Sequence, residues 1–208
     1  LAPFGIPLVG VNQGRLGFLT DLSLDSMKRS LNAMLQGEFV TEQRMLLSVQ
    51  VLRQDLEVCR ALAFNEMVVH RSNIASMIEC EVRIDGDYLY TQRADGLIIS
   101  TPTGSTAYSL SAGGPIVHPA LDVMTLVPVC PHTLSNRPIV VSGGSVIEVL
   151  MHRTGDVHAR FDSHTHFDLQ LHDRLVVTRH KEMVHLLHPA GHSYYHTLRE
   201  KLLWNKSL

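Results

Sequence analysis

A change of hydrophobic pattern at Met45 is the sequence feature that most constrains the fold. From Met45 onward, apolar and polar residues alternate in short runs that are bounded by turn residues. Asp85-Gly86 and Gly143-Gly144 each lie between two such runs, which predicts two hairpin turns. The pattern indicates an antiparallel, sandwich-like β domain over roughly 41–188. The expected strands are 45–53, 56–64, 78–84, 87–92, 95–101, 125–130, 138–142, 145–151, 157–161, 166–171, 174–180 and 183–188.

The segments on either side of this β domain predict a strand and two helices. Residues 6–11 form an apolar run, which we expect to be a central strand of an α/β sheet. A turn-rich loop follows, and apolar side chains at helical spacing then predict a helix over 22–36, capped by Asp21 or Ser23. A second helix is expected after Pro189, with leucines spaced to dock on a partner surface.

Composition narrows the class of protein. With 208 residues, 45% hydrophobic, 18% charged and a net charge of -2, the chain can form one large domain or two modest ones. It lacks the basic excess of a general nucleic-acid binder. It also lacks an apolar run of the roughly 20 residues that a membrane helix requires, so we expect neither nucleic acid nor membrane as partner and a cytoplasmic location. Cys59, Cys80 and Cys130 lie far apart, which favours buried thiols over disulfides or a zinc site.

The stretch from Asp95 to Pro119 predicts a ligand site. An apolar run at 97–99 suits a buried strand and is followed by hydroxyl, proline and glycine residues. Ser105 or Thr106 could cap a short helix and leave its first backbone N–H groups free for a polar ligand. An ordinary Ser/Thr-rich loop is the alternative, but a long, lysine-free ordered loop more often carries function. The Gly-x-Ser-x-Gly elbow of serine hydrolases is absent.

This stretch resembles the NAD kinase family of bacteria. It contains the family's Asp-Gly, a hydrophobic strand, Ser-Thr-Pro-Thr-Gly-Ser-Thr-Ala-Tyr and a Gly-Gly pair. Together with three further stretches, it covers nearly the whole chain in the family's order. The further stretches are 10–21 (Gly-Val-Asn-Gln-Gly-Arg-Leu-Gly-Phe-Leu-Thr-Asp), Asn65-Glu66 and 131–138 (Pro-His-Thr-Leu-Ser-Asn-Arg-Pro).

The resemblance implies two domains and one activity. Residues 1–40 would be the C-terminal part of an α/β, Rossmann-like nucleotide-binding domain, with 189–208 packing back on it, and 41–188 would be the NAD-binding β domain. The implied reaction is ATP-dependent phosphorylation of the adenosine ribose 2′-hydroxyl of NAD, giving NADP. No lysine lies between Lys28 and Lys181, so P-loop chemistry is excluded. The family implies Mg²⁺ carried by ATP and a homo-oligomer, either dimer or tetramer.

The resemblance also implies which residues bind NAD. Asn65 and Glu66 adjoin an apolar stretch, where an amide and a carboxylate need partners. Those partners could belong to the protein, but the matching family residues bind ribose hydroxyls. Asp95 matches a residue on the nicotinamide side, and Arg93 resembles members that prefer NAD to its reduced form. The remaining expected contacts are Phe18 (with Asn12 in the same loop), Thr106, Ala107, Tyr108 and Ser111 around adenine, and Asp162 as a further site aspartate.

The general base is expected outside these residues. The family's Gly-Gly-Asp-Gly motif, whose aspartate is regarded as that base, does not occur in the sequence. We therefore expect no catalytic residue in this chain, a start within a domain, and little or no kinase activity from these 208 residues alone. Alternatives are a catalytically incomplete dinucleotide-binding module and a related lipid kinase, although Tyr108 and Ser111 argue against a lipid. The choice between ATP and polyphosphate as donor stays open.

Several histidines have spacings that suggest metal ligands. Without a Glu or Cys at supporting positions, surface imidazoles are the favoured interpretation. The residues concerned are His158, His164, His166, His185, His188 and His192.

Overall fold

The computed structural model describes residues 4–13, 17–71, 77–133, 135–153, 156–163 and 165–204, and the chain divides into two compact units. Leu1–Arg44 and Glu182–Leu208 form the first unit, and Met45–Lys181 forms the second. The C-terminal segment therefore belongs with the N-terminal segment. The expected boundaries after 40 and 188 fall inside strands β3 (Phe39–Arg44) and β16 (Val184–Pro189), which pair with each other in antiparallel fashion.

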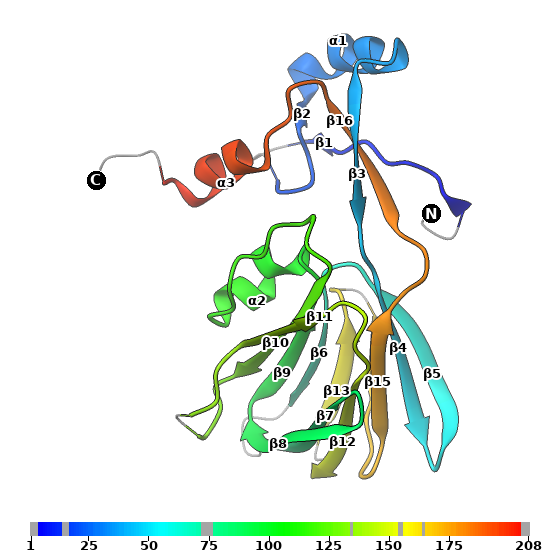
Figure 1. Cartoon of the computed structure of the whole chain (residues 1–208), viewed down its shortest axis with the longest axis vertical. Helices are drawn as coiled ribbons and strands as arrows, with labels where there is room; N and C mark the ends of the chain where they lie inside the picture. Colours follow the sequence, from blue (N-terminus) through cyan, green and yellow to red (C-terminus); the bar gives the residue numbers. More distant parts are fainter. Residues whose placement is uncertain are drawn as a thin grey trace. The chain divides into compact units, whose positions relative to one another are not determined.

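The second unit is an antiparallel β-sandwich, as the alternating pattern predicts (Figure 1). Its two six-stranded sheets are called sheet I, with order β11-β10-β9-β6-β13-β14, and sheet II, with order β5-β4-β15-β12-β7-β8. Sheet I contains β6 (Glu66–Arg71), β9 (Gly96–Ser100), β10 (Val123–Val129), β11 (Ile139–Ser142), β13 (Val157–Phe161) and β14 (Thr165–Asp168). Sheet II contains β4 (Leu47–Arg53), β5 (Leu56–Ala63), β7 (Ile78–Ile84), β8 (Asp87–Ala94), β12 (Ile147–Arg153) and β15 (Arg174–Arg179).

The centre of sheet I is buried on both of its faces. Every residue of β9 is buried, and Val68, Ile98 and Val127 form a cluster against which Ala112 packs. Ala112 follows a 3₁₀ turn, η2 (Gly104–Thr106), and a short helix, α2 (Tyr108–Ser111), so this connection covers part of the outer face (Figure 1). Double-sided burial also explains why the sequence pattern misses β6: its apolar run does not alternate.

One predicted hairpin is confirmed and the other is wrong. Asp85 and Gly86 connect the paired strands β7 and β8 with φ angles of 53° and 87°, the left-handed values that a tight hairpin turn requires. Gly143 and Gly144 instead connect β11 of sheet I to β12 of sheet II. A Cβ on Gly143 would lie 2.0 Å from an Asp122 carboxylate oxygen, so this glycine permits a close approach rather than a hairpin.

The first unit retains one βα step of an α/β arrangement. Strand β1 (Val11–Asn12) pairs in parallel with β2 (Leu22–Ser23), and α1 (Leu24–Leu35) follows with Ser23 as its N-cap, where the Ser26 N–H donates to the Ser23 hydroxyl. The expected strand over 6–11 is wrong in extent, because only Leu8 bridges to β16 before β1. The helix expected after Pro189 is α3 (Tyr194–Leu202). Among the described residues, no helix is long and apolar enough to span a membrane.

A buried ion cluster joins the β3–β16 ribbon to Asp21, the residue that precedes β2. His188 is only 2% exposed; its Nδ1 hydrogen-bonds the Asp21 carboxylate, and its Nε2 lies 3.0 Å from Glu42 Oε2. Arg44 also donates to Glu42, at 2.8 Å. The interpretation of His188 as a surface imidazole is therefore wrong, because two acidic partners offset the burial of its positive charge.

In this cluster His188 is held in its protonated form and Glu42 in its ionised form. Burial alone would lower the pKa of His188, but its hydrogen bonds to Asp21 and Glu42 outweigh burial and raise the pKa to about 9. Burial likewise opposes ionisation of Glu42, but His188 and Arg44 lower its pKa to about 2. His192 stacks on His188 at 4.0 Å with an interplanar angle of 16°. Since a metal ion lies in the plane of each imidazole that binds it, these nearly parallel rings are poorly placed to share one.

Replacing His188 should destabilise the protein in a pH-dependent manner. His188→Gln leaves two largely buried carboxylates without their shared cation, so we expect a loss of about 2 to 4 kcal/mol at pH 6. Because the folded-state pKa is raised from 6.5 to about 9, this contribution is full below pH 6.5 and lost as the pH rises through 9. Urea unfolding at several pH values measures it. The exposed His196→Gln in α3 is the control, and equal behaviour of both variants would contradict the assignment.

Candidate functional site

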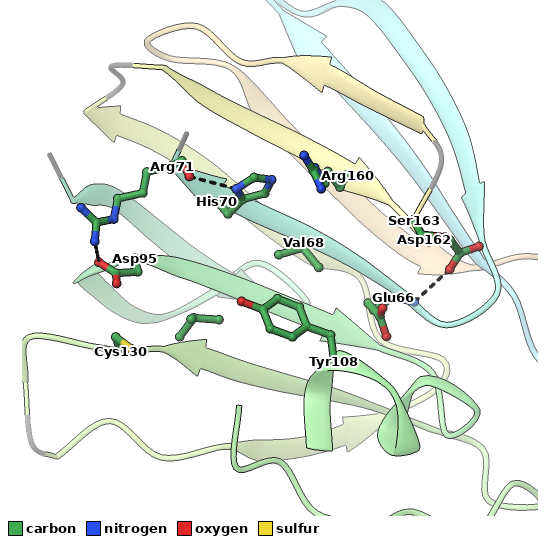
Figure 2. Close-up of a pocket in the computed structure, with 11 residues that line it drawn as sticks. Glu66, Val68, His70, Arg71, Asp95, Tyr108, Cys130, Arg160, Asp162 and Ser163 are labelled. Atoms are coloured by element: carbon green, nitrogen blue, oxygen red, sulfur yellow. Dashed lines mark hydrogen bonds and ion pairs between the residues drawn. The ribbon is translucent and has the colours of Figure 1, made fainter. Parts of the chain in front are cut away.

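A cavity of about 610 Å³ lies on the outer face of sheet I, within the second unit (Figure 2). Strand β6 directs alternate residues, Glu66, Val68 and His70, into it, because side chains along a strand alternate between faces. The Tyr108 ring lies across from these residues (Figure 2). The main polar residues along its walls are Glu66, His70, Arg71, Asp95, Tyr108 and Arg160.

The turn at Phe64–Glu66 is held by the carboxylate of Asp162, which also lines the cavity. That carboxylate accepts the backbone N–H groups of Phe64 at 2.8 Å, Asn65 at 2.7 Å and Glu66 at 3.3 Å. In return, the Asp162 N–H donates to the Glu66 carbonyl at 3.0 Å. Asp162 itself has a left-handed φ of 52°, a strained conformation for a residue with a side chain. The predicted site aspartate therefore shapes the turn that carries Asn65 and Glu66.

The hydroxyl residues of the signature stretch hold the same turn from the other side. The Thr101 N–H donates to the Asn65 carbonyl at 2.9 Å, and the Thr101 hydroxyl donates to the Phe64 carbonyl at 2.7 Å. A Cβ on Gly104 would lie 2.2 Å from that Asn65 oxygen, so only glycine fits there. Ser105 does not cap α2 as predicted; its hydroxyl donates to the Pro102 carbonyl at 2.6 Å.

Glu66 presents a buried acceptor to the cavity. Its side chain belongs to a residue only 8% exposed, and its Oε2 has no hydrogen-bond partner among the described residues. Burial, together with the negative charge of Asp162, raises the pKa of Glu66 to about 7. A buried carboxyl oxygen of this kind costs free energy unless a donor reaches it, so the position suits a ligand hydroxyl.

The far end of the cavity holds an ion pair. Asp95 lies just before β9, and its carboxylate is 2.8 Å from the Arg71 guanidinium at the end of β6. Arg93, expected to act beside Asp95, instead pairs with Glu79 at 2.7 Å across sheet II and does not line the cavity. The sequence reasoning missed Arg71 and His70; recognising β6 as a strand would have found His70, since it follows Glu66 at a spacing of four.

The remaining residues that were expected to bind NAD do not line this cavity. Thr106 at the end of η2 and Ala107 between η2 and α2 are half-buried, and Ser111 is exposed at the end of α2; none of the three lines the cavity. Phe18 belongs to the first unit, in the turn before β2, so its predicted contact with NAD stays a prediction.

The cysteines and histidines partly follow expectation. Cys80 is a buried thiol as predicted and Cys59 is half-buried, whereas Cys130 is exposed and lines the cavity. Its φ of 45° belongs to the sharp turn after β10. His164 lies outside the described residues.

Comparison with known proteins supplies the family. The family described as ATP-NAD kinase C-terminal domain matches residues 64–188. The NAD kinase of Nitrosomonas europaea is 58% identical over 205 residues, which cover 99% of this chain and 69% of that protein. The NAD kinase of Thiobacillus denitrificans is 52% identical over 208 residues, covering 100% of this chain and 72% of that protein. The chain therefore belongs to the NAD kinase family.

Two solved structures share the fold. Yeast NADH kinase complexed with NADH is 26% identical with a TM-score of 0.89, and the match covers 97% of this chain but 61% of that one. An NAD kinase from Archaeoglobus fulgidus in complex with ATP is 29% identical with a TM-score of 0.78, covering 95% of this chain and 74% of that one. This chain thus spans roughly two thirds of the length of the proteins it resembles.

Gly104→Ala should displace the turn that carries Glu66. The added Cβ overlaps backbone atoms of Asn65 at 2.2 and 2.5 Å, so we expect a loss of about 1 to 3 kcal/mol in unfolding free energy. Gly144→Ala is the matched control, because the nearest atom to its Cβ would lie 3.7 Å away. Thermal unfolding measures both variants. Equal stability of Gly104→Ala and wild type would show that the close approach at Asn65 does not constrain this turn.

Proposed function

We propose that this protein is an NAD kinase that transfers the terminal phosphate of ATP to the 2′-hydroxyl of the adenosine ribose of NAD, giving NADP. The observation that carries the proposal is the buried, unpartnered carboxyl oxygen of Glu66 in the cavity of a chain of this family. An oxygen in this position can accept a ribose O–H. The complexes of the related yeast and archaeal enzymes with NADH and ATP support the choice of substrates.

The cavity suggests how a dinucleotide would be arranged. Asn65 and Glu66 would bind ribose hydroxyls. Asp162 and Thr101 hold the turn that contains both residues. Tyr108 would contact the flat face of adenine, with Thr106, Ala107 and Ser111 nearby in sequence. Asp95, oriented by Arg71, would lie toward nicotinamide. These roles follow the family resemblance and fit the lining of the cavity at Glu66, Tyr108 and Asp95.

Phosphoryl transfer needs a base and compensation of phosphate charge. The base is expected from the Gly-Gly-Asp-Gly motif, which does not occur in this sequence. ATP would enter as its Mg²⁺ complex, so the ion belongs to the substrate. The residues of this chain would bind NAD and orient its 2′-hydroxyl. A dimeric or tetrameric assembly and a cytoplasmic location are parts of the same proposal.

The alternatives receive less support. A lipid kinase would require a site for an acyl chain, whereas the polar residues of this cavity suit hydroxyls and phosphates. A binding-only module shares the same cavity, and NADP formation by the protein together with its Gly-Gly-Asp-Gly segment would distinguish the enzyme from the module.

NAD should bind to this chain, and Tyr108→Ala should weaken that binding about tenfold. Stacking of a base on an aromatic ring contributes roughly 1 to 3 kcal/mol. Isothermal titration with NAD measures the effect, with Tyr88→Ala as control because Tyr88 is an exposed tyrosine of β8 in sheet II. If the folded chain does not bind NAD, the assignment of the NAD site is wrong. If both variants bind equally, Tyr108 is not an adenine contact.

The affinity for NAD should increase with pH through Glu66. A ribose hydroxyl donates to the ionised carboxylate, so binding favours the form that predominates above the pKa of about 7. We expect roughly fourfold weaker binding at pH 6.5 than at pH 8. His70 should contribute little, because burial lowers its pKa below the usual value. Glu66→Gln should bind more weakly and with no such dependence. A wild-type affinity that is constant over this range would contradict the role of Glu66.

A further inference from the structure

Arg160 is a cation of the cavity that is not paired with any of the described residues. It lies on β13 of sheet I, is exposed and lines the cavity. In the part of the chain that the structure describes, its guanidinium makes no hydrogen bond or ion pair with another residue. Arg71, the other arginine of the cavity, is paired with Asp95. An arginine left unpaired beside a ligand cavity invites an anionic group of that ligand.

The strand register places Arg160 next to a second unsatisfied polar group. Arg160 lies opposite Val68, and His158 lies opposite His70, so Arg160 and His70 are diagonal neighbours on the same face. Figure 2 shows both on the wall that faces Tyr108. The Nδ1 of His70 bonds the Arg71 carbonyl at 2.9 Å, so Nδ1 carries the proton, while the buried Nε2 has no partner among the described residues. This wall of the cavity therefore carries polar groups that lack hydrogen-bond partners among the described residues.

The acidic groups of the cavity do not neutralise Arg160. The Asp162 carboxylate is bonded to three backbone N–H groups, and that of Asp95 is bonded to Arg71. The Oε2 of Glu66 has no hydrogen-bond partner among the described residues, so it does not bond Arg160. Asp168, on the neighbouring strand β14 and outside the cavity lining, is 2.6 Å from His158 Nδ1. The positive charge of Arg160 thus stays available on this wall.

We propose that Arg160 binds the diphosphate bridge of the dinucleotide. This inference rests on the proposed function, because it adds a subsite to the same NAD cavity. A diphosphate bears two negative charges and several acceptor oxygens, which match the planar, five-donor guanidinium. Arg160 lies between Glu66, proposed to contact ribose, and His70 along the wall, where the bridge between two nucleoside halves would pass.

Isothermal titration with two ligands tests the subsite. Arg160→Gln should lower the affinity for NAD about tenfold and leave that for adenosine, which has no phosphate, within about twofold. Raising the salt concentration should weaken NAD binding less in this variant than in wild type. Arg160→Lys, which keeps the charge but not the planar fork, should fall between. Arg153→Gln, an exposed arginine at the end of β12 outside the cavity, should match wild type.

The outcomes separate the two proposals. If wild type fails to bind NAD, the proposed function and this subsite are both wrong. If wild type binds NAD and Arg160→Gln binds it equally well, only the subsite is wrong. If Arg160→Gln loses NAD and adenosine to the same degree, Arg160 supports the cavity structure and does not bind phosphate. Thermal unfolding of each variant shows whether it is folded before titration.

Discussion

The bonds from the Asp162 carboxylate to three successive backbone N–H groups are the constraint on which the candidate site depends. They fix the turn that ends one sheet's edge strand, β5, and begins β6 in the other sheet. Hydrogen bonds to a charged acceptor are stronger than neutral ones, so this turn is held tightly without help from a ligand. The same carboxylate disfavours ionisation of nearby Glu66. Asp162 thus positions the residue proposed to contact ribose and adds to the effect of burial, which is the larger cause of the raised pKa of Glu66.

The hydroxyl-rich signature stretch has a structural role, because its residues hold this turn in place. Thr101 bonds the carbonyls of Phe64 and Asn65, and Gly104 leaves room for the Asn65 carbonyl. Ser105 bonds the Pro102 carbonyl and receives the Val117 N–H at 3.0 Å, tying the two ends of the connection together. These hydroxyls satisfy backbone groups and do not point free donors at a ligand. The stretch supports the turn and positions Tyr108, and glycine is required at Gly104 because the Asn65 backbone lies against it.

Sequence reasoning found the sandwich and most of its strands because half-buried strands alternate visibly. It could not find β6, whose apolar run is buried on both faces, or β3, whose partner β16 lies far along the chain. It identified Glu66, Asp95, Tyr108 and Asp162, which the structure brings to one cavity, through resemblance and not through pattern. It missed Arg71, His70 and Arg160, since their positions follow from strand register across β6, β9 and β13. The partner of His188 was equally hidden, because Asp21 lies far from it along the chain, whereas Arg93 faces Glu79 across the predicted β7–β8 hairpin.

The polar groups of the cavity that lack partners indicate what kind of ligand would fit it. In the described cavity, most charged side chains are already paired, which leaves an acceptor at Glu66 and a cation at Arg160 on neighbouring strands. A hydroxyl donor and an anion must therefore be offered by the same molecule at short separation. Ribose joined to phosphate has this arrangement, and Tyr108 adds an aromatic surface for a base. An acyl chain offers no donor to Glu66 and no anion to Arg160, so it would leave the buried Glu66 oxygen unpaired.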